Sequence, residues 1–317
     1  MKKRKLAVVA IGGNALIPDA QRLSIDDQYQ MICMLAEIIA DMETDGWRIL
    51  LTHGNGPQVG FIMRRSELAS HEVSPVSMDT AGADLQGGIG YMFVKALRNS
   101  LARRGIKRDP VAIITHTIVE RDDPAFAVPT KPIGSWMSED TAREMSEKLG
   151  WTVCEDSGRG WRRVVASPLP CRILEQDAIA AMVEMGFLVI AGGGGGIPVL
   201  YNDEGELEGV EAVIDKDRTS AILANALGAG LLMLPTGVER VALDFGKPDQ
   251  RWLDVMTMEE AASYMKANQF GVGSMEPKIA ALMDFVGKSG CDGVITSIPK
   301  MREALEGKAG TRLVFSS

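Results

Sequence analysis

The feature that most constrains the fold is a run of five glycines, Gly192–Gly196, directly after an apolar segment, Phe187–Ile190. That segment is short and rich in branched residues, which is typical of a buried strand. Glycine has no side chain to bury and loses the most backbone entropy on ordering, so five in a row indicate that the backbone itself must approach something. Successive bare N–H groups form cradles for anions, and we therefore expect phosphate to bind at Gly193, Gly194 and Gly195. A flexible linker is the alternative, but the Ile-Pro-Val that follows the glycines argues against it.

Composition and charge restrict the class of protein. The 317 residues are 46% hydrophobic and 24% charged, which suits one large α/β domain or two smaller ones. The net charge of −8 argues against a nucleic-acid partner, because binding the phosphate backbone requires clustered Lys and Arg. The N-terminal apolar run ends at Ile11 and is too short for a secretory or membrane-spanning segment. The four cysteines are scattered, which favours reduced thiols over disulfides or a metal site. We expect a cytoplasmic protein without a membrane partner.

Strand-like and helix-like segments alternate along most of the chain. Lys5–Ile11, Arg48–Leu51 and Val111–Thr115 read as strands, and Asp26–Thr44 and Thr80–Arg104 read as helices. The glycines within the second helix are expected to let another backbone approach closely. After residue 172 the alternation continues through Ile173–Met185, Phe187–Ile190, Arg218–Leu227, Leu231–Leu234, Glu239–Leu243, Thr257–Asn268, Pro277–Lys288, Gly293–Ser297, Lys300–Leu305 and Leu313–Phe315. This pattern predicts a mainly parallel sheet covered on both faces.

The alternation is interrupted between His116 and Arg163. This stretch is polar, contains prolines and shows one helical pattern, at Ser138–Leu149. We expect it to leave the main sheet as a small subdomain or lid.

Further glycine-rich turns follow the first two predicted strands, at Gly12-Gly13-Asn14 and His53–Gly56. In parallel sheets ligands bind outside the carboxyl ends of the strands, which is where these turns fall. The chain lacks the G-x-x-x-x-G-K-[ST] motif of P-loop proteins. The glycines from Gly54 to Gly60 approach a dinucleotide fingerprint, but the third is one place late and no strand-ending acid follows. A hydride-transfer enzyme is therefore a weak competitor.

Three lysines stand in turns that glycine, proline or aspartate shape. Lys131 lies between two prolines, Lys216 lies between two aspartates at the entry to a helix, and Lys278 follows Gly-Ser-Met-Glu-Pro. Any one of them alone would read as a solvated surface group. Together they suit phosphoryl transfer, which requires positive charge against the phosphoryl oxygens. Asp217 could orient the ammonium groups or bind Mg²⁺, or it could cap the following helix.

The shortage of bases bears on the acceptor. Of three histidines only His53 lies in a glycine-rich loop, and for it we favour a structural hydrogen-bonding role. A hydroxyl acceptor usually needs a general base, whereas a carboxylate is already an anion. The residues therefore favour phosphorylation of a carboxylate, although an aspartate could still serve as a base.

Long motifs in a fixed order carry a resemblance to a known family. They are VVAIGGNAL (8–16), LTHGNGPQVG (51–60), QGGIGY (86–91), PTKPIG (129–134), ASPLP (166–170), AGGGGGIPV (191–199), AVIDKD (212–217), FGKPDQ (245–250) and GSMEPK (273–278). On these motifs the sequence resembles the carbamate kinases of the amino acid kinase superfamily.

The resemblance implies a single domain over residues 1–317, built as an α/β, three-layer αβα sandwich with a mainly parallel eight-stranded sheet. It also implies a protruding subdomain at 117–164 and a homodimer. The implied reaction is ATP + carbamate ⇌ ADP + carbamoyl phosphate with Mg²⁺, run toward ATP in the breakdown of nitrogen compounds.

The resemblance also implies roles for matching residues. Gly12, Gly13 and Asn14 would hold the transferring phosphoryl group, and Gly54 and Asn55 would hold carbamate. Lys131 would reach in from the subdomain, while Lys216 and Lys278 would stabilise the phosphoryl charge and Asp217 would organise them. The nucleotide would be held by Thr236, Gly237, Val238, Lys247, Met275 and Pro277. The resemblance leaves the metal ligands unassigned.

The sequence departs from the family pattern at Gly237 and Ala242, where the family commonly has Asp and Tyr, and again at Asp79–Gly82. These departures favour one alternative, a related kinase of another small carboxylate. A second alternative is a non-catalytic sensor of carbamoyl phosphate that kept the pocket, and the intact Lys131, Lys216, Asp217 and Lys278 weigh against it. The departures also allow a divergent branch that acts in ureide or purine breakdown instead of arginine fermentation.

Overall fold

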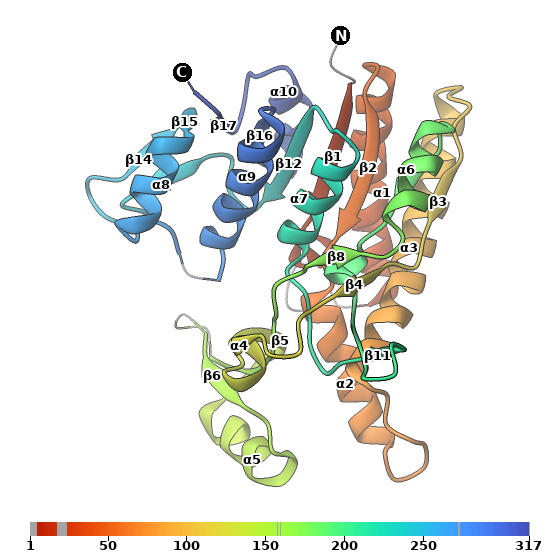
Figure 1. Ribbon diagram of the computed structural model, residues 1–317, viewed down its shortest axis with the longest axis vertical. Coiled ribbons are helices and arrows are strands. Elements are labelled where there is room, and N and C mark those ends of the chain that lie inside the picture. The colour runs from red at the N-terminus through yellow and green to blue at the C-terminus, as the bar shows by residue number, and fades with distance from the viewer. Residues whose placement is uncertain (1–4, 18–23, 157, 159, 272, 317) are drawn as a thin grey trace.

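Helices cover both faces of one large β-sheet in the computed structural model of the chain, which describes residues 5–17, 24–156, 158, 160–271 and 273–316 (Figure 1). The strands of this sheet are β1 (Leu6–Ile11), β2 (Arg48–His53), β3 (Pro110–Ala112), β9 (Leu188–Ile190), β12 (Leu231–Thr236), β15 (Val255–Thr257), β16 (Asp292–Ser297) and β17 (Thr311–Val314). Their spatial order is β15-β17-β16-β12-β1-β2-β9-β3. Neighbours run parallel except β16 and β17, which are antiparallel. The predicted eight-stranded, mainly parallel sheet is confirmed.

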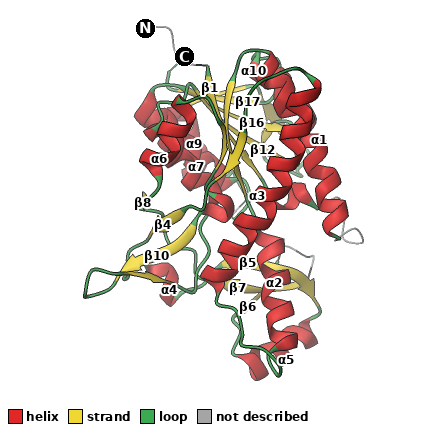
Figure 2. Ribbon diagram, turned by 90° about the vertical axis from the view of Figure 1, so that its right-hand side faces the viewer, coloured by secondary structure: helices red, strands yellow, loops and turns green. Residues whose placement is uncertain are grey.

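Helices form the two outer layers of the sandwich, and α4 and α5 lie away from the large sheet. Their bounds are α1 (Ile25–Thr44), α2 (Gly56–Ala69), α3 (Met78–Arg103), α4 (Pro124–Ala127), α5 (Glu139–Leu149), α6 (Gln176–Glu184), α7 (Lys216–Ala226), α8 (Met258–Lys266), α9 (Glu276–Ser289) and α10 (Met301–Leu305). Figure 2 shows α1, α3 and α10 against one face of the sheet and α6, α7 and α9 against the other. Short 3-10 helices occur at Gly13–Leu16 (η1), Gly193–Gly195 (η2) and Ile298–Lys300 (η3).

Strand β1 shows why the sheet is central. All six of its residues are buried, as expected of a parallel strand with helices on both faces. Because side chains alternate along a strand, Ala7, Val9 and Ile11 pack into the core with α1 and α3. The alternate side chains pack into the second core with α7 and α9. The carboxyl ends of β1 and β2 are thereby fixed between two cores.

The chain leaves the large sheet between β3 and β9 and again after β9, and these two excursions build two smaller sheets. One has the order β11-β10-β4-β8, and the other has the order β5-β7-β6. The bounds of these strands are β4 (His116–Ile118), β5 (Lys131–Met137), β6 (Val153–Glu155), β7 (Trp161–Val165), β8 (Arg172–Ile173), β10 (Ile197–Tyr201) and β11 (Leu207–Gly209). We call the described residues of 131–165, which contain β5, α5, β6 and β7, the outer unit. Figure 2 shows it beyond the large sheet and beside α2. Strand β4, at the start of the range 117–164, pairs with β10 instead.

Several predicted elements differ from the structure. The third strand is β3 at Pro110–Ala112, shorter than expected, because the Thr115 amide is taken by a side chain, Gln86 Oε1 at 2.8 Å. The segment Glu239–Leu243 yields β13 (Val241–Leu243), which pairs with β14 (Arg251–Leu253) in a hairpin outside the large sheet. The edge strand β15 was not predicted, since three residues carry little periodicity.

The glycines of α3 fulfil the expected close approach only in part. A Cβ on Gly90 would lie 2.8 Å from the side chain of Ala112, whereas Gly87 and Gly88 have nothing within 4 Å among the described residues. The expectation is therefore wrong for Gly87 and Gly88 within this chain.

In the described part of the chain no helix combines the length and the apolar character that crossing a bilayer requires.

Candidate active site

The loops after β1 and β2 touch through their backbones. The Gly54 amide donates to the Ile11 carbonyl at 2.8 Å, and a Cβ on Gly54 would lie 2.8 Å from the Gly13 nitrogen. The same Cβ would lie 3.2 Å from the Cδ of Lys216, at the start of α7. Glycine is therefore required where three chain segments converge. The turn from Gly12 continues into η1, in which Asn14 is exposed.

The five-glycine run forms a third wall of the same site. A Cβ on Gly194 would lie 2.3 Å from Asn55 Nδ2, and one on Gly193 would lie 2.6 Å from His53 Nε2. Asn55 and His53 are both buried, so their side chains fill the space that the glycines leave. Gly194 also has a φ of +67°, in the left-handed region. The run is thus rich in glycine largely because side chains of the β2 loop press against it.

The hydrogen bonds of this run correct part of the anion-cradle prediction. The Gly195 amide donates to the Gly192 carbonyl at 3.0 Å, so Gly195 does not present a bare N–H group to phosphate in this structure. The Gly195 carbonyl accepts hydrogen bonds from Thr117 Oγ1 and Thr219 Oγ1 at 2.8 and 2.7 Å. Within the described residues, the amides of Gly193 and Gly194 donate to no other group.

The three predicted lysines meet two carboxylates on one helical turn. Lys131 Nζ, from β5, lies 2.6 Å from Asp215 Oδ2, and Lys278 Nζ, from α9, lies 2.8 Å from Asp217 Oδ2. Lys216 Nζ contacts the other carboxylate oxygen of Asp217. The Asp217 amide donates to Asp215 Oδ1 at 2.9 Å, which ties the two acids together. The structure therefore brings Lys131, Lys216 and Lys278 to one place from three different elements.

Asp215 resolves one of the open alternatives. It is the N-cap of α7, since its carboxylate accepts the Asp217 amide, while Asp217 lies inside the first turn. The reading of Asp217 as the cap is wrong. The Asp217 carboxylate does not cap the helix and instead accepts hydrogen bonds from Lys216 and Lys278.

Burial and charge set the ionisation of this cluster. Burial lowers the pKa of Lys216 to about 8, against the opposing effect of Asp217. Burial alone would raise the pKa of the Asp217 carboxyl, but Lys216 and Lys278 hold that pKa well below its usual range. For Lys278 the attraction of Asp217 outweighs burial and raises the pKa. Asp217 is therefore ionised at neutral pH, and Lys216 loses its proton at a lower pH than Lys278 does.

His53 is neutral at physiological pH. Complete burial lowers its pKa to about 4, and its ring stacks on Phe93 with the ring centroids 6.0 Å apart. Its Nδ1 lies 3.3 Å from the Gly54 carbonyl oxygen. These contacts agree with the structural role favoured from the sequence.

Most of the predicted nucleotide-binding residues lie at the end of β12 and at the start of α9. Thr236 ends β12, with Gly237 and Val238 after it, and Met275 and Pro277 begin α9, the helix that carries Lys278. Lys247 makes none of its described contacts with these residues. Its Nζ contacts Asp244 Oδ1 at 2.8 Å and its side chain is largely exposed. The described contacts join Lys247 to Asp244 and not to the lysines of the site.

Three residues of the site were missed in the sequence. Asp215 receives Lys131, Gln58 Nε2 donates to the Gly13 carbonyl at 3.2 Å, and Gln86 Nε2 donates to the Gly193 carbonyl at 3.0 Å. Gln58 and Gln86 are buried and stand in the motifs LTHGNGPQVG and QGGIGY. A buried amide beside a glycine-rich turn is the signal that could have revealed them, because buried polar groups must find hydrogen-bond partners.

Comparisons with known proteins identify the family of this chain. The sequence model described as the amino acid kinase family matches residues 5–297. The chain is 45% identical to the carbamate kinase of Thermococcus kodakarensis, covering 98% of this chain and 99% of that protein. It is also 45% identical to the carbamate kinase-like protein YahI of Escherichia coli, again over 98% and 99%. Among solved structures, the carbamate kinase from Giardia lamblia bound to AMP-PNP matches with a TM-score of 0.90, 36% identity and full coverage of both chains.

Proposed function

The chain belongs to the amino acid kinase family, and from this premise we propose that it is a carbamate kinase that catalyses ATP + carbamate ⇌ ADP + carbamoyl phosphate. The observation that carries the proposal is the meeting of Lys131, Lys216 and Lys278 beside the loops that end β1 and β2. Cations at this position would face the oxygens of a phosphoryl group in transfer. Carbamate kinases that are 44–45% identical to this chain over nearly its full length support the same reaction.

We assign the chemistry as follows. The Gly12-Gly13-Asn14 turn and the amides of Gly193 and Gly194 would bind the transferring phosphoryl group. Donors of this kind act best when they are already fixed in place, as these backbones are. Lys216 and Lys278 would offset the charge that spreads over its oxygens, with Asp217 holding both ammonium groups in position.

Carbamate would lie at Gly54 and Asn55, with Lys131 against it. Carbamate carries its own negative charge, so it attacks without losing a proton to a base. The neutral, buried state of His53 suits such an acceptor, since no histidine is needed to activate it. Thr236, Gly237, Val238, Met275 and Pro277 would hold the nucleotide, and Lys247 would reach it from the loop after β13.

Magnesium is proposed to enter with the nucleotide. Among the described residues no three His, Cys, Asp or Glu side chains gather as a metal site, and both oxygens of Asp217 already contact lysines. Mg²⁺ is usually held by substrate phosphates with few protein ligands, and these residues fit that mode. When bound there, the ion would neutralise charge on the nucleotide phosphates.

The proposal extends to the setting of the enzyme. We propose a cytoplasmic homodimer that runs toward ATP in the breakdown of nitrogen compounds, with residues 117–164 acting as a protruding subdomain over the substrate. The support is the resemblance to carbamate kinases together with the position of Lys131 on β5.

A direct assay tests the reaction. The protein is mixed with ADP, Mg²⁺ and carbamoyl phosphate, and ATP formation is followed beside a Lys216→Ala control. We expect ATP at a rate far above the control. No difference between the two proteins would end the proposal, and measurable turnover would exclude a non-catalytic sensor.

A second candidate is a kinase of another small carboxylate. A relative at 45% identity is named only carbamate kinase-like, and Gly237 and Ala242 depart from the family pattern. Release of ADP from ATP is measured with carbamate and with a panel of small carboxylic acids. Preference for carbamate over every other acid removes this candidate.

A further inference from the structure

Two glycines bring the outer unit into backbone contact with α2. A Cβ on Gly60 would lie 2.0 Å from the Cα and 2.4 Å from the nitrogen of Gly134, in β5. Real Cβ atoms essentially never come within 3.0 Å of a heavy atom outside their own residue and its chain neighbours. Gly134 itself has a φ of +71°, a conformation that suits glycine. At this distance between the two backbones, position 60 admits no side chain at all.

The contact lies on the strand that carries Lys131. Gly134 is three residues further along β5, and in the same strand Lys131 pairs with Val165 of β7. The Gly134 carbonyl accepts a hydrogen bond from Arg162 Nη2 at 2.8 Å, which ties it to β7 as well. Ile133, between them, is buried in the core shared with α1 and α3. Residues 131–133 pair with 163–165 of β7, and the register of this ladder shifts directly after Ile133. A displacement of Gly134 therefore reaches Lys131 through these three paired residues.

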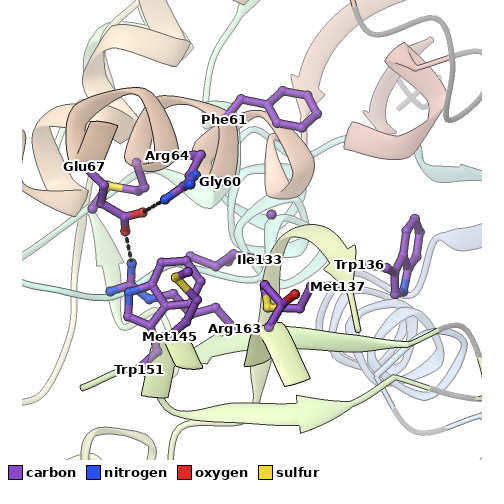
Figure 3. A pocket seen from close by; sticks show the side chains of 13 residues that line it. Gly60, Phe61, Arg64, Glu67, Ile133, Trp136, Met137, Met145, Trp151 and Arg163 are labelled. Atoms are coloured by element: carbon purple, nitrogen blue, oxygen red, sulfur yellow. Dashed lines mark hydrogen bonds and ion pairs between the residues drawn. The ribbon is translucent and has the colours of Figure 1, made fainter. Parts of the chain in front are cut away.

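The rest of this interface is packed more loosely. A cavity of about 220 Å³ separates α2 from the outer unit, with Phe61 and Met63 on the α2 side and Met145 and Trp151 on the other (Figure 3). Across it, Arg163 Nη1 lies 3.5 Å from Glu67 Oε1, longer than a good hydrogen bond. Apart from the buried Ile133, the side chains around the cavity make long contacts, whereas the two glycines hold α2 and β5 at backbone contact distance.

We propose that the Gly60–Gly134 contact positions Lys131, setting how far its ammonium group reaches toward Asp215 and the site beside it. Gly60 is a positioning residue in this account, because it acts through β5 and not on the substrate. The kinetic consequence rests on the proposed function, whereas the geometric consequence does not.

The test is the variant Gly60→Ala, read first by lysine labelling. The protein is treated briefly with acetic anhydride, and mass spectrometry gives the labelling rates of Lys131 and Lys278. Alanine suits the interior of a helix better than glycine, so any harm must come from the contact with Gly134. We expect the ratio of the Lys131 rate to the Lys278 rate to rise several-fold. An unchanged ratio, or an equal rise at both lysines, would overturn the proposal.

Two control variants isolate the contact. Gly88→Ala makes the same change on an exposed face of α3, where nothing lies within 4 Å in the described chain. Met63→Leu alters the cavity wall without a large change in volume. Both should leave the labelling ratio at its wild-type value, and a rise in either to the level of Gly60→Ala would contradict a specific role for Gly60.

Steady-state kinetics provide the second measurement. In Gly60→Ala the KM for carbamoyl phosphate should rise about tenfold or more, because small misplacements of a binding group are costly. The KM for ADP should stay near wild type. Equal rises in both constants would indicate general damage and refute positioning. If the wild-type protein makes no ATP, the proposed function fails, but the labelling ratio still decides the role of Gly60.

Discussion

Replacing Asp217 by Asn should move the alkaline limit of activity to lower pH. Asp217 contacts the ammonium groups of Lys216 and Lys278, and its attraction supports the charged form of Lys216 against burial and against repulsion from Lys278. In the wild-type protein the pKa of Lys216 is about 8, so this lysine loses its proton as the pH rises through that value. If transfer requires the ammonium form, kcat/KM falls above about pH 8.

The size of the shift follows from the charge that is lost. A unit charge at about 4 Å contributes roughly 4 kcal/mol at an effective dielectric of about 20, and one pKa unit corresponds to about 1.4 kcal/mol. Losing the full charge would lower the pKa of Lys216 by up to about three units, and the remaining Asn dipole and solvent reduce that figure. A fall from about 8 to about 6.5 would lower the protonated fraction at pH 7.5 about eightfold.

The assay is the pH dependence of ATP formation from ADP and carbamoyl phosphate. The limb of kcat/KM should move from near pH 8 in the wild type to below about pH 7 in Asp217→Asn. The profile of kcat should move less, because bound phosphoryl oxygens supply the missing negative charge. An alkaline limb that stays near pH 8 in the variant would refute the assignment of that ionisation to Lys216.

Three further changes test other parts of the structure. Lys131→Ala should lower kcat/KM for carbamoyl phosphate about tenfold or more while calorimetry finds the Kd of ADP nearly unchanged, and equal losses would contradict its placement on the carbamoyl side. His53→Gln should leave the pH profile of kcat/KM between about pH 5 and 7 unaltered, because the His53 pKa is about 4. An inflection in this range that is present in the wild type and absent in the variant would contradict that expectation. Phe285→Ala, at a fully buried position, should lower the free energy of unfolding in urea by about 3–5 kcal/mol, and a loss below about 1 kcal/mol would mean that the core refills the space.

The large sheet could be predicted because its strands carry strong local signals. Segments such as Leu6–Ile11 are buried on both faces and therefore read as unbroken apolar runs. The short edge strand Val255–Thr257 and the hairpin strand Val241–Leu243 lack such a signal, and three residues do not reveal which sheet they join. Membership of a sheet is decided by tertiary contacts that local periodicity does not encode.

In the candidate site too, some features have a local sequence signal and others depend on tertiary contacts. Three lysines in shaped turns could be identified individually, but the pairing of Lys131 with Asp215 spans 84 positions and has no local trace. The glycines of 193–195 were predicted to bind phosphate through their amides, and the contact of this run with the loop after β2 was not predicted. Sequence suggests bare amides, whereas the structure shows that Asn55 and His53 leave no room for a Cβ.

The pairing of the lysines with Asp215 and Asp217 has a consequence for how any substrate is taken up. Three cations already hold two anions of the protein's own, so an arriving phosphate must compete with those carboxylates in an exchange of ions. Such an exchange depends less on ionic strength than capture by exposed charges does, since buried pairs are screened weakly. An anion that binds the lysines more weakly than a carboxylate does cannot displace Asp215 and Asp217. The two aspartates therefore select for anions that bind strongly, such as phosphate.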